Sequence, residues 1–261
     1  TGPRVLKMIQ GMRNGDALIL ENLRTDPREE KNSRAFAQEL ASYADIYVNE
    51  AFSVSHRAHA SIMGVPQYLP SFIGFLFDKE CKALTPLRNP AKPFALILGG
   101  AKFETKLPLL RYYLSKTSDI ILGGALANTF FKEQGFEMGK SVVAKKISGL
   151  KPFLKNKKIS LPTDVVLSTG SLRRPEKLLS TEKITDIGPE TVEHIIKVLK
   201  KTRTVLFNGP VGIYGDGFDE GTKDILKALV RSKAKVIVGG GDTLAVVAML
   251  KLEKKFHFVS T

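Results

Sequence analysis

The chain has a single cysteine among its 261 residues and no long apolar run. One thiol, Cys81, cannot form an internal disulfide, and no paired cysteine or histidine spacing suits zinc. No window approaches the ~20 apolar residues of a membrane span. The start, Thr1 to Arg4, lacks both an initiator methionine and a signal-peptide pattern. These absences favour a soluble, cytoplasmic protein without a membrane partner. Thr1 is expected to be a point of truncation rather than the natural start of the protein.

Acidic residues are few relative to basic ones. The 40 lysines and arginines outnumber the 26 aspartates and glutamates, so the net charge is +14. An excess of this size favours anionic partners: phosphorylated metabolites, nucleotides, nucleic acid or an acidic membrane surface. The longest basic stretch, Lys151–Lys158, has apolar residues threaded through it and no aromatic ladder. It is therefore interpreted as a solvated helix end or loop rather than a nucleic-acid patch.

One local plan recurs along the second part of the chain: a short apolar run meets glycines and is followed by a helical pattern. The segments that share it are Phe94–Gly100, Asp119–Gly124, Thr204–Gly212 and Lys235–Gly241. Repeated strand, glycine turn and helix predict βα units and a mainly parallel sheet. The runs are almost entirely apolar, as expected for strands covered by helices on both faces. A doubly wound domain is predicted from about residue 90 onward.

The first part of the chain has fewer elements. Strands are predicted at Ala17–Glu21 and Asp45–Asn49, with a helix near Ser33–Tyr43 between them that Asn32 or Ser33 could cap. Two strands are too few for an independent parallel sheet, so this domain is expected to be incomplete.

Helical spacing at Phe75–Leu87, ended by a proline-containing stretch, predicts a helix at about 74–88 that joins two domains. The expected parts are a partial N-terminal domain at 1–73, the helix and hinge at 74–89, and a C-terminal domain at 90–261. A last strand is predicted at Phe256–Val259, leading directly into Thr261.

Ligands of parallel α/β sheets bind beyond the carboxyl ends of the strands, where turns expose backbone amides. Gly239-Gly240-Gly241-Asp242-Thr243 falls at such a place and offers free amides, a carboxylate for Mg²⁺ and a hydroxyl. The same residues would also suit a tight turn in which Asp242 or Thr243 caps the next helix. Spacing alone does not decide between a phosphate site and a turn.

Two further turns meet the same edge. In Gly99–Lys106, Lys102 and Lys106 lie four residues apart and would share one face of a helix start, from which both could reach a phosphate chain. Lysines at this spacing are also common on solvated helix surfaces. In Asn208–Gly212, Pro210 stiffens the loop, and the glycines allow a flat nucleotide base to approach the backbone closely. Taken alone, this segment predicts only a turn.

Arginines and histidines of the first part follow its two predicted strands. Arg24 ends one strand, and His56, Arg57 and His59 follow the other. Guanidinium groups hold carboxylate or phosphate bidentately, so this edge suits a small doubly anionic metabolite. The histidines taken alone would more readily form a capping and loop network. No metal is expected there.

Seven motifs taken together resemble phosphoglycerate kinase in order and approximate spacing. They are Leu-Glu-Asn-Leu-Arg (20–24), Val-Asn-Glu-Ala-Phe (48–52), His-Arg-Ala-His-Ala-Ser (56–61), Gly-Gly-Ala-Lys-x-x-x-Lys (99–106), Gly-Gly-Ala-Leu-Ala-Asn-Thr-Phe (123–130), Asn-Gly-Pro-Val-Gly (208–212) and Gly-Gly-Gly-Asp-Thr (239–243). The resemblance implies two doubly wound, Rossmann-like parallel-sheet domains, the first incomplete here. It implies a monomer that transfers a phosphoryl group between 1,3-bisphosphoglycerate and ADP, with 3-phosphoglycerate bound by the first domain, MgADP or MgATP by the second, and no nucleic acid.

The resemblance also implies roles for single residues. Substrate binding would fall to Arg24, Arg57 and His56, and Mg²⁺ binding to Asp242. Catalysis would involve Lys102, Lys106, Gly240, Gly241 and Thr243. The nucleotide-binding positions would be Gly100, Ala101, Lys106, Gly123, Gly124, Asn208, Pro210, Gly212, Gly215, Gly240, Gly241, Asp242 and Thr243.

Three departures from the family pattern bear on activity. The first strand of the family, with its Asp-Phe-Asn segment and the arginine that follows, has no counterpart here, nor does the glycine-rich segment expected after Thr261. The glutamate that usually contacts the ribose is replaced by Gly215, with Asp216 as the nearest substitute. Low turnover is therefore expected from these residues alone. The alternative function is a truncated, non-catalytic nucleotide-binding module.

Overall fold

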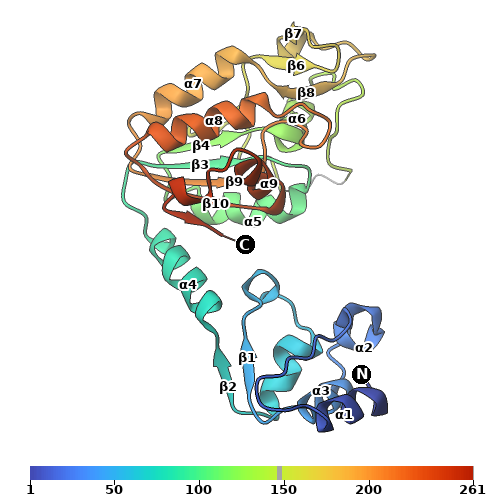
Figure 1. Ribbon diagram of the computed structural model, residues 1–261. Helices are drawn as coiled ribbons and strands as arrows, with labels where there is room; N and C mark the ends of the chain where they lie inside the picture. Colours follow the sequence, from blue (N-terminus) through green and yellow to red (C-terminus); the bar gives the residue numbers. More distant parts are fainter. Residues whose placement is uncertain (146–148, 261) are drawn as a thin grey trace. The chain divides into compact units, whose positions relative to one another are not determined.

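The computed structural model describes residues 1–145 and 149–260, which form two compact units (Figure 1). Unit 1 is Thr1–Thr85 and unit 2 is Pro86–Thr261. Each unit is considered by itself below. Thr261, to which the predicted strand at 256–259 leads, lies outside the described residues. None of the described helices is long and apolar enough to cross a membrane.

A parallel sheet forms the centre of unit 2. Across residues 86–145 and 149–260 it has six strands in the order β11-β10-β9-β3-β4-β5. Their bounds are β3 Phe94–Leu98, β4 Asp119–Leu122, β5 Ile159–Ser160, β9 Thr204–Asn208, β10 Lys235–Gly239 and β11 Phe258–Val259. Leu96 of β3 is paired with Leu206 of β9, which in turn is paired with Ile237 of β10. The four predicted βα strands and the predicted C-terminal strand are confirmed.

Helices alternate with these strands and cover the sheet. They are α5 Phe103–Tyr113, α6 Gly124–Glu133, α7 Pro189–Leu199, α8 Glu220–Arg231 and α9 Gly241–Met249, with short 3-10 turns η6 Pro175–Lys177 and η7 Glu253–Lys255. Figure 1 shows α7 and α8 side by side on one face of the sheet and α5 on the other. Burial on both faces explains why the strands are so apolar.

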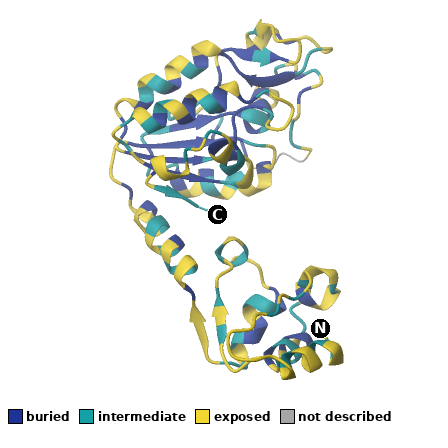
Figure 2. Cartoon of the chain, in the orientation of Figure 1, coloured by how far each residue is buried: buried dark blue, intermediate teal, exposed yellow. Residues whose placement is uncertain are grey.

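One core cluster of unit 2 packs the sheet against α7 and α8. Val205 and Phe207 of β9 are fully buried, and they pack in one cluster with Ile195 of α7 and Ile225 of α8. In α7 the buried residues Thr191, Ile195 and Leu199 recur at helical spacing. The outer faces of both helices are exposed, as the alternating colours of Figure 2 show. Burial of these large side chains, each contributing about 1.5–3 kcal/mol, stabilises the layer.

A small antiparallel sheet, which the sequence pattern did not indicate, is inserted between β5 and α7. In the described part it consists of β7 Leu172–Arg173, β6 Val165–Leu167 and β8 Ile184–Ile187, in that order. Its strands are two to four residues long, and an irregularity lies between Val166 and Leu167. Strands this short have no clear apolar alternation, which is why they were missed.

Unit 1 is built mainly from short helical segments. Its elements are α1 Pro3–Gln10, η1 Leu23–Thr25, α2 Pro27–Glu30, α3 Arg34–Ala41, β1 Tyr47–Asn49, η2 Phe52–Val54, the π-turn η3 Ala60–Gly64, η4 Val65–Gln67, β2 Ser71–Ile73 and α4 Phe75–Leu84. The 3-10 turn η5 Thr85–Arg88 follows α4 and extends beyond the end of unit 1. The strands β1 and β2 pair in parallel as a two-stranded sheet within this fully described unit.

One predicted strand of unit 1 is wrong. Residues 17–21 run as irregular chain, without a ladder to another strand, and Ile19 is 93% exposed. An apolar run becomes a strand only when a neighbouring strand takes up its amides and carbonyls. The predicted strand at 45–49 is confirmed as β1, but its partner β2 was missed. The predicted helix at 33–43 is confirmed as α3, with Ser33 at its N-cap position but no side-chain capping bond.

The predicted helix at 74–88 is confirmed as α4 and η5, and its start has a specific cap. Both carboxylate oxygens of Glu50 accept hydrogen bonds from the first turn, from the Leu76 amide at 3.2 Å and the Phe77 amide at 2.8 Å. A Cβ at Gly74 would collide with the Glu50 carboxylate. A negative charge at a helix N-terminus is stabilising, so Glu50 and Gly74 together define where α4 begins.

Candidate functional site

The glycine turns of unit 2 are joined to one another at the carboxyl ends of the strands. The Gly99 amide donates to the Asn208 carbonyl at 3.1 Å, and the Gly100 amide donates to the Pro210 carbonyl at 2.8 Å. The Gly124 amide donates to the carbonyl of Val211 at 2.8 Å. The turn after β9 is thereby held between the turns after β3 and β4. The predicted convergence of these motifs at one edge is observed.

Several of these glycines are required by close backbone approach. A Cβ at Gly99 would lie 2.7 Å from the Gly209 carbonyl oxygen and still closer to the Pro210 carbonyl. A Cβ at Gly123 would lie 2.6 Å from the Cβ of Val211. Real Cβ contacts are not this short, and the opposing atoms at Gly99 are backbone. The turns therefore pack so closely at this edge that there is no room for a side chain at Gly99 or Gly123.

The Gly239–Thr243 turn forms the start of α9. Gly240 has φ +91°, a left-handed conformation that favours glycine, and α9 begins at Gly241. Amides in the first turn of a helix have no intrahelical acceptor, so those of Gly241, Asp242 and Thr243 can bind an anion. The Thr243 side chain is buried, and its hydroxyl accepts a hydrogen bond from the Gly209 amide at 2.9 Å. Its hydroxyl thus connects two turns, while its amide belongs to the helix start.

The predicted lysines, asparagine and aspartate form one polar group beside this helix start. The Lys106 ammonium group is in close contact with the Asn208 side-chain oxygen. Burial is the main cause that lowers the pKa of Lys106; the charge of Lys102 lowers it further, and the carboxylate of Asp242 opposes both. Lys102 is exposed. The site therefore places two cations and one carboxylate around free helix amides.

A cavity of about 250 Å³ lies next to these turns, within unit 2. Of the predicted nucleotide-binding positions, those in its wall are Gly100, Ala101, Gly124, Pro210, Gly212 and Asp242. The other predicted positions lie outside the lining: Lys106, Gly123, Asn208, Gly215, Gly240, Gly241 and Thr243. Asp216 does line it, as does the neighbouring Tyr214. Gly215 has φ +100° and an open surrounding.

Sequence reasoning missed one wall of the cavity. This wall is formed by Val142, Pro162 and residues 183–187 around β8. The side-chain amide of Asn128 holds Val142 by donating a hydrogen bond of 3.1 Å to its backbone carbonyl. Nothing in the spacing of the 140–187 segment marks these residues as ligand-facing. Only Asn128, inside the Gly-Gly-Ala-Leu-Ala-Asn motif, could have indicated that this segment is attached to the site.

Asp186 is a buried carboxylate in the same wall. It accepts hydrogen bonds from the Ile187 amide and from the Gly221 amide in the first turn of α8, both at 2.8 Å. These bonds favour the charged form, but burial outweighs them and raises the pKa of Asp186 to about 6. The protonation state of this cavity wall is therefore expected to change just below neutral pH.

The raised pKa of Asp186 predicts a pH effect on stability. Between the unfolded value of 3.8 and the folded value of about 6, the folded state binds more protons, so its stability rises as the pH falls from 7 to 5. Asp186 should contribute about 1 kcal/mol to this rise. Urea unfolding at both pH values should show the contribution lost in Asp186→Asn and kept in Asp216→Asn, an exposed control. Equal pH dependence in all three proteins would contradict the assignment.

The predicted substrate residues of unit 1 are exposed. Arg24 lies in η1, where its amide donates to the Asn22 side chain at 3.0 Å, and His56 and Arg57 follow η2. Within this fully described unit no hydrogen bond or ion pair joins the three side chains to each other. They are available to an anion from solvent.

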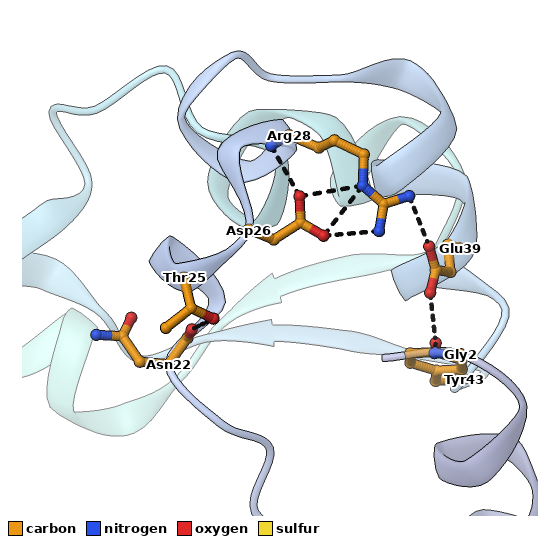
Figure 3. A network of polar contacts seen from close by, with 7 residues as sticks. All are labelled: Gly2, Asn22, Thr25, Asp26, Arg28, Glu39 and Tyr43. Atoms are coloured by element: carbon orange, nitrogen blue, oxygen red, sulfur yellow. Dashed lines mark hydrogen bonds and ion pairs between the residues drawn. The ribbon is translucent and has the colours of Figure 1, made fainter.

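Polar networks hold the segments that carry these residues. In Figure 3 the Arg28 guanidinium binds Asp26 at 2.7 Å and Glu39 at 3.2 Å, and the Tyr43 hydroxyl accepts from the Gly2 amide and donates to Glu39. The Arg28 side chain is the main cause that lowers the pKa of Asp26. These contacts join α2 to α3 and to the N-terminal segment.

A second network, not indicated by the motifs, is centred on Glu29. This buried carboxylate accepts from the Ser61 hydroxyl at 2.6 Å and from the Ser61 amide at 3.0 Å, and the Nδ1 of His59 lies 3.7 Å away. His59 thus belongs to a loop network rather than to the exposed cation group. No cluster of three or more histidine, cysteine, aspartate or glutamate side chains suited to a metal occurs among the described residues.

Comparisons with known proteins agree on one family. The family model described as "Phosphoglycerate kinase" matches residues 1–261. Curated relatives named phosphoglycerate kinase include those of Coprothermobacter proteolyticus, 42% identical, and Roseiflexus sp., 40% identical; each match covers the whole chain and 70% of the relative. The solved structure of phosphoglycerate kinase from Pyrococcus horikoshii matches with a TM-score of 0.84 at 30% identity, covering 100% of this chain and 71% of that one. The structure from Coxiella burnetii matches with a TM-score of 0.76 at 34% identity, covering 95% and 68%.

Proposed function

The chain belongs to the phosphoglycerate kinase family, and from this premise we propose how its residues serve the reaction. The reaction, ATP:3-phosphoglycerate phosphotransfer, moves a phosphoryl group reversibly between a carboxyl group of the glycerate and a nucleotide. The observation that carries the proposal is the meeting of Lys106, Asn208 and Asp242 at the start of α9, beside a cavity. We further propose a monomeric, cytoplasmic enzyme.

The C-terminal domain, at 90–261, is the proposed nucleotide-binding domain. The cavity would take the adenosine, with backbone of Gly100, Gly124 and Gly212 against the base and sugar. The turn residues outside the lining, Gly123, Asn208 and Gly240, would shape and support it. Since Gly215 has no side chain to offer the ribose, Asp216 in the cavity wall is proposed in its place.

Asp242 fits a magnesium site of the kind shared with a nucleotide. Mg²⁺ is usually held by one or two carboxylates together with substrate phosphates and water. Asp242 is exposed, lines the cavity and lies at the helix start that would face the phosphates. Because substrate phosphates and water would supply the remaining ligands, Asp242 could be the only protein ligand of the ion. The bound ion would neutralise phosphate charge.

The residues around α9 would hold the transferring group. Lys102 and Lys106 would bind nucleotide phosphates, with Lys106 next to the group in flight. The amides of Gly240, Gly241 and Thr243 would neutralise negative charge on its oxygens. Phosphoryl transfer depends on positioning and charge stabilisation rather than on covalent chemistry, which suits a site made of cations and amides.

The N-terminal domain, at 1–73, is the proposed 3-phosphoglycerate-binding domain, with 74–89 as the joining helix and hinge. Arg24 and Arg57 would hold the glycerate phosphate through bidentate contacts, and His56 would donate a further hydrogen bond. Exposure of all three side chains supports their availability. The alternative, a nucleotide-binding module without catalysis, is not favoured because the family match extends over both units.

Calorimetric titration with MgADP tests the nucleotide site. The chain should bind MgADP, and Asp242→Ala should bind about tenfold more weakly, because one charged ligand to the metal is lost. Asp224→Ala, which removes an exposed carboxylate from α8, is the control and should bind as the unchanged chain does. Equal affinity in all three proteins would refute the magnesium role of Asp242. Circular dichroism on the same samples separates lost binding from lost folding.

Turnover by these 261 residues alone should be low. In unit 1 the two-stranded sheet leaves Val48 of β1 and Phe72 of β2 more than half exposed, so the domain that would bind the glycerate has a small core. A coupled assay with 3-phosphoglycerate and MgATP measures this directly. Turnover at the rate normal for a kinase, about 1–100 per second, would contradict the prediction.

A further inference from the structure

The α7–α8 face of unit 2 has a groove that the proposed reaction does not use. Its volume is about 670 Å³, within the usual range of ligand pockets. Val192 and Ile196 of α7 and Ala228 of α8 form its floor, and all three are only partly buried. Floor and rim positions extend from Val192 of α7 to Lys200, the residue that follows this helix, so the groove is about two helical turns, roughly 12 Å, long.

The rim of this α7–α8 groove is strongly basic. Lys200, Lys227, Arg231 and Lys233 line it, and Asp224 is the one acidic lining residue. Asp224 pairs with Lys227 at 3.2 Å, whereas the other three cations form no ion pair within the described residues. Lysine and arginine often occur at helix C-termini because they offset the helix dipole. That accounts for Lys200 and Arg231, but not for Lys233 beyond α8 or for the uncovered apolar floor.

The α7–α8 groove lies away from the proposed nucleotide site. Thr202 and Lys233 in its wall lie two residues before the starts of β9 and β10, at the amino ends of these strands. The glycine turns occupy the opposite, carboxyl ends of the same strands. A ligand in the groove would therefore not compete with a nucleotide for space.

We propose that the α7–α8 groove docks a short acidic, amphipathic segment of a partner protein. An apolar floor between two helices takes apolar side chains spaced as on a helix, and a cationic rim takes carboxylates that flank them. A second copy of the chain is a poor occupant, since the net charge of +14 makes the copies repel. A nucleic acid would satisfy the rim alone and leave the floor uncovered.

Selection from a displayed library of random 12-residue peptides tests the docking proposal. We expect enriched peptides to combine two or three apolar residues at helical spacing with several aspartates or glutamates. Synthesised binders should lose at least tenfold in affinity, by fluorescence anisotropy, for Lys200→Glu/Arg231→Glu. The control is Lys151→Glu/Lys155→Glu, which changes two exposed lysines outside the groove and lowers the net charge equally. MgADP should not displace the peptides.

Three results would overturn the proposal. One is enrichment of no acidic amphipathic sequence. Another is equal loss of affinity in the two double variants, which would show that net charge alone attracts the peptides. The third is an oligonucleotide of equal charge that binds as tightly as the best peptide and is equally sensitive to Lys200→Glu/Arg231→Glu, which would assign the groove to polyanions. Ala228→Leu, which fills the floor without altering charge, should weaken peptide binding and leave oligonucleotide binding unchanged.

Discussion

Replacing Gly209 by alanine should destabilise unit 2 by about 3 kcal/mol, through two additive effects. Gly209 has φ +95°, a left-handed conformation that costs other residues ~1–2 kcal/mol. A Cβ there would also lie 2.6 Å from the Gly99 carbonyl carbon and closer to its oxygen. Because both are backbone atoms of a central turn, they cannot move aside without disturbing the hydrogen bond from the Gly209 amide to Thr243. Urea unfolding gives the loss, and MgADP calorimetry should show weaker binding.

Gly135→Ala is the matched control for Gly209→Ala. Gly135 has φ +91° but nothing within 4 Å of the position of an added Cβ. The Gly135→Ala variant should lose only the stability that the left-handed backbone conformation costs an alanine, about 1 kcal/mol, and its nucleotide affinity should be unchanged. Equal destabilisation of the two variants would show that the close approach of the turns after β3 and β9 does not contribute to the cost of the Gly209 substitution.

Lys106→Met should lower the affinity for MgATP by roughly 10- to 100-fold, the equivalent of a charged hydrogen bond of ~1.5–3 kcal/mol. Free of ligand, the variant should be as stable as the unchanged chain or more stable. Burial of the ammonium group disfavours its charge and lowers the pKa of Lys106, so a flexible apolar side chain of similar length removes an unfavourable charge. Affinity and stability would thus change in opposite directions.

Lys102→Met is the control for the lysine pair. Lys102 is exposed, so its charge is screened by solvent and a smaller loss of affinity is expected. Isothermal calorimetry and thermal unfolding on the same three proteins measure both quantities. Loss of stability in Lys106→Met without loss of affinity would assign Lys106 to folding, through its contact with Asn208, and would contradict the proposed phosphate role.

Predictions from local pattern were most accurate in unit 2. The apolar runs ended by glycines became β3, β4, β9 and β10, because such runs are stable as strands only when helices cover both faces. Their parallel arrangement brings all the turns to one edge, so topology predicted that the segments carrying Lys106, Asn208 and Asp242 lie at the same edge. The contact between the Lys106 and Asn208 side chains appears only in the tertiary structure.

Predictions failed where a partner in space decides the outcome. Residues 17–21 have the composition of a strand but no neighbour to bond with, whereas β2 at Ser71–Ile73, which was not predicted, exists because Tyr47–Asn49 pairs with it. The small sheet β7-β6-β8 was missed because its strands of two to four residues have no clear apolar alternation, and one wall of the cavity was missed with it.

The sequence by itself determined the class of fold, the order of the βα units and the chemistry of their turns, because these depend on neighbours within a few residues. Only the tertiary structure decided what burial and contact create. In the folded chain Asp186 is buried, which raises its pKa, and Glu29 accepts a hydrogen bond from Ser61. The Thr243 hydroxyl joins two turns that are far apart in the sequence. Desolvation and hydrogen bonding across long stretches of chain have no local signature, since both depend on which distant segments meet.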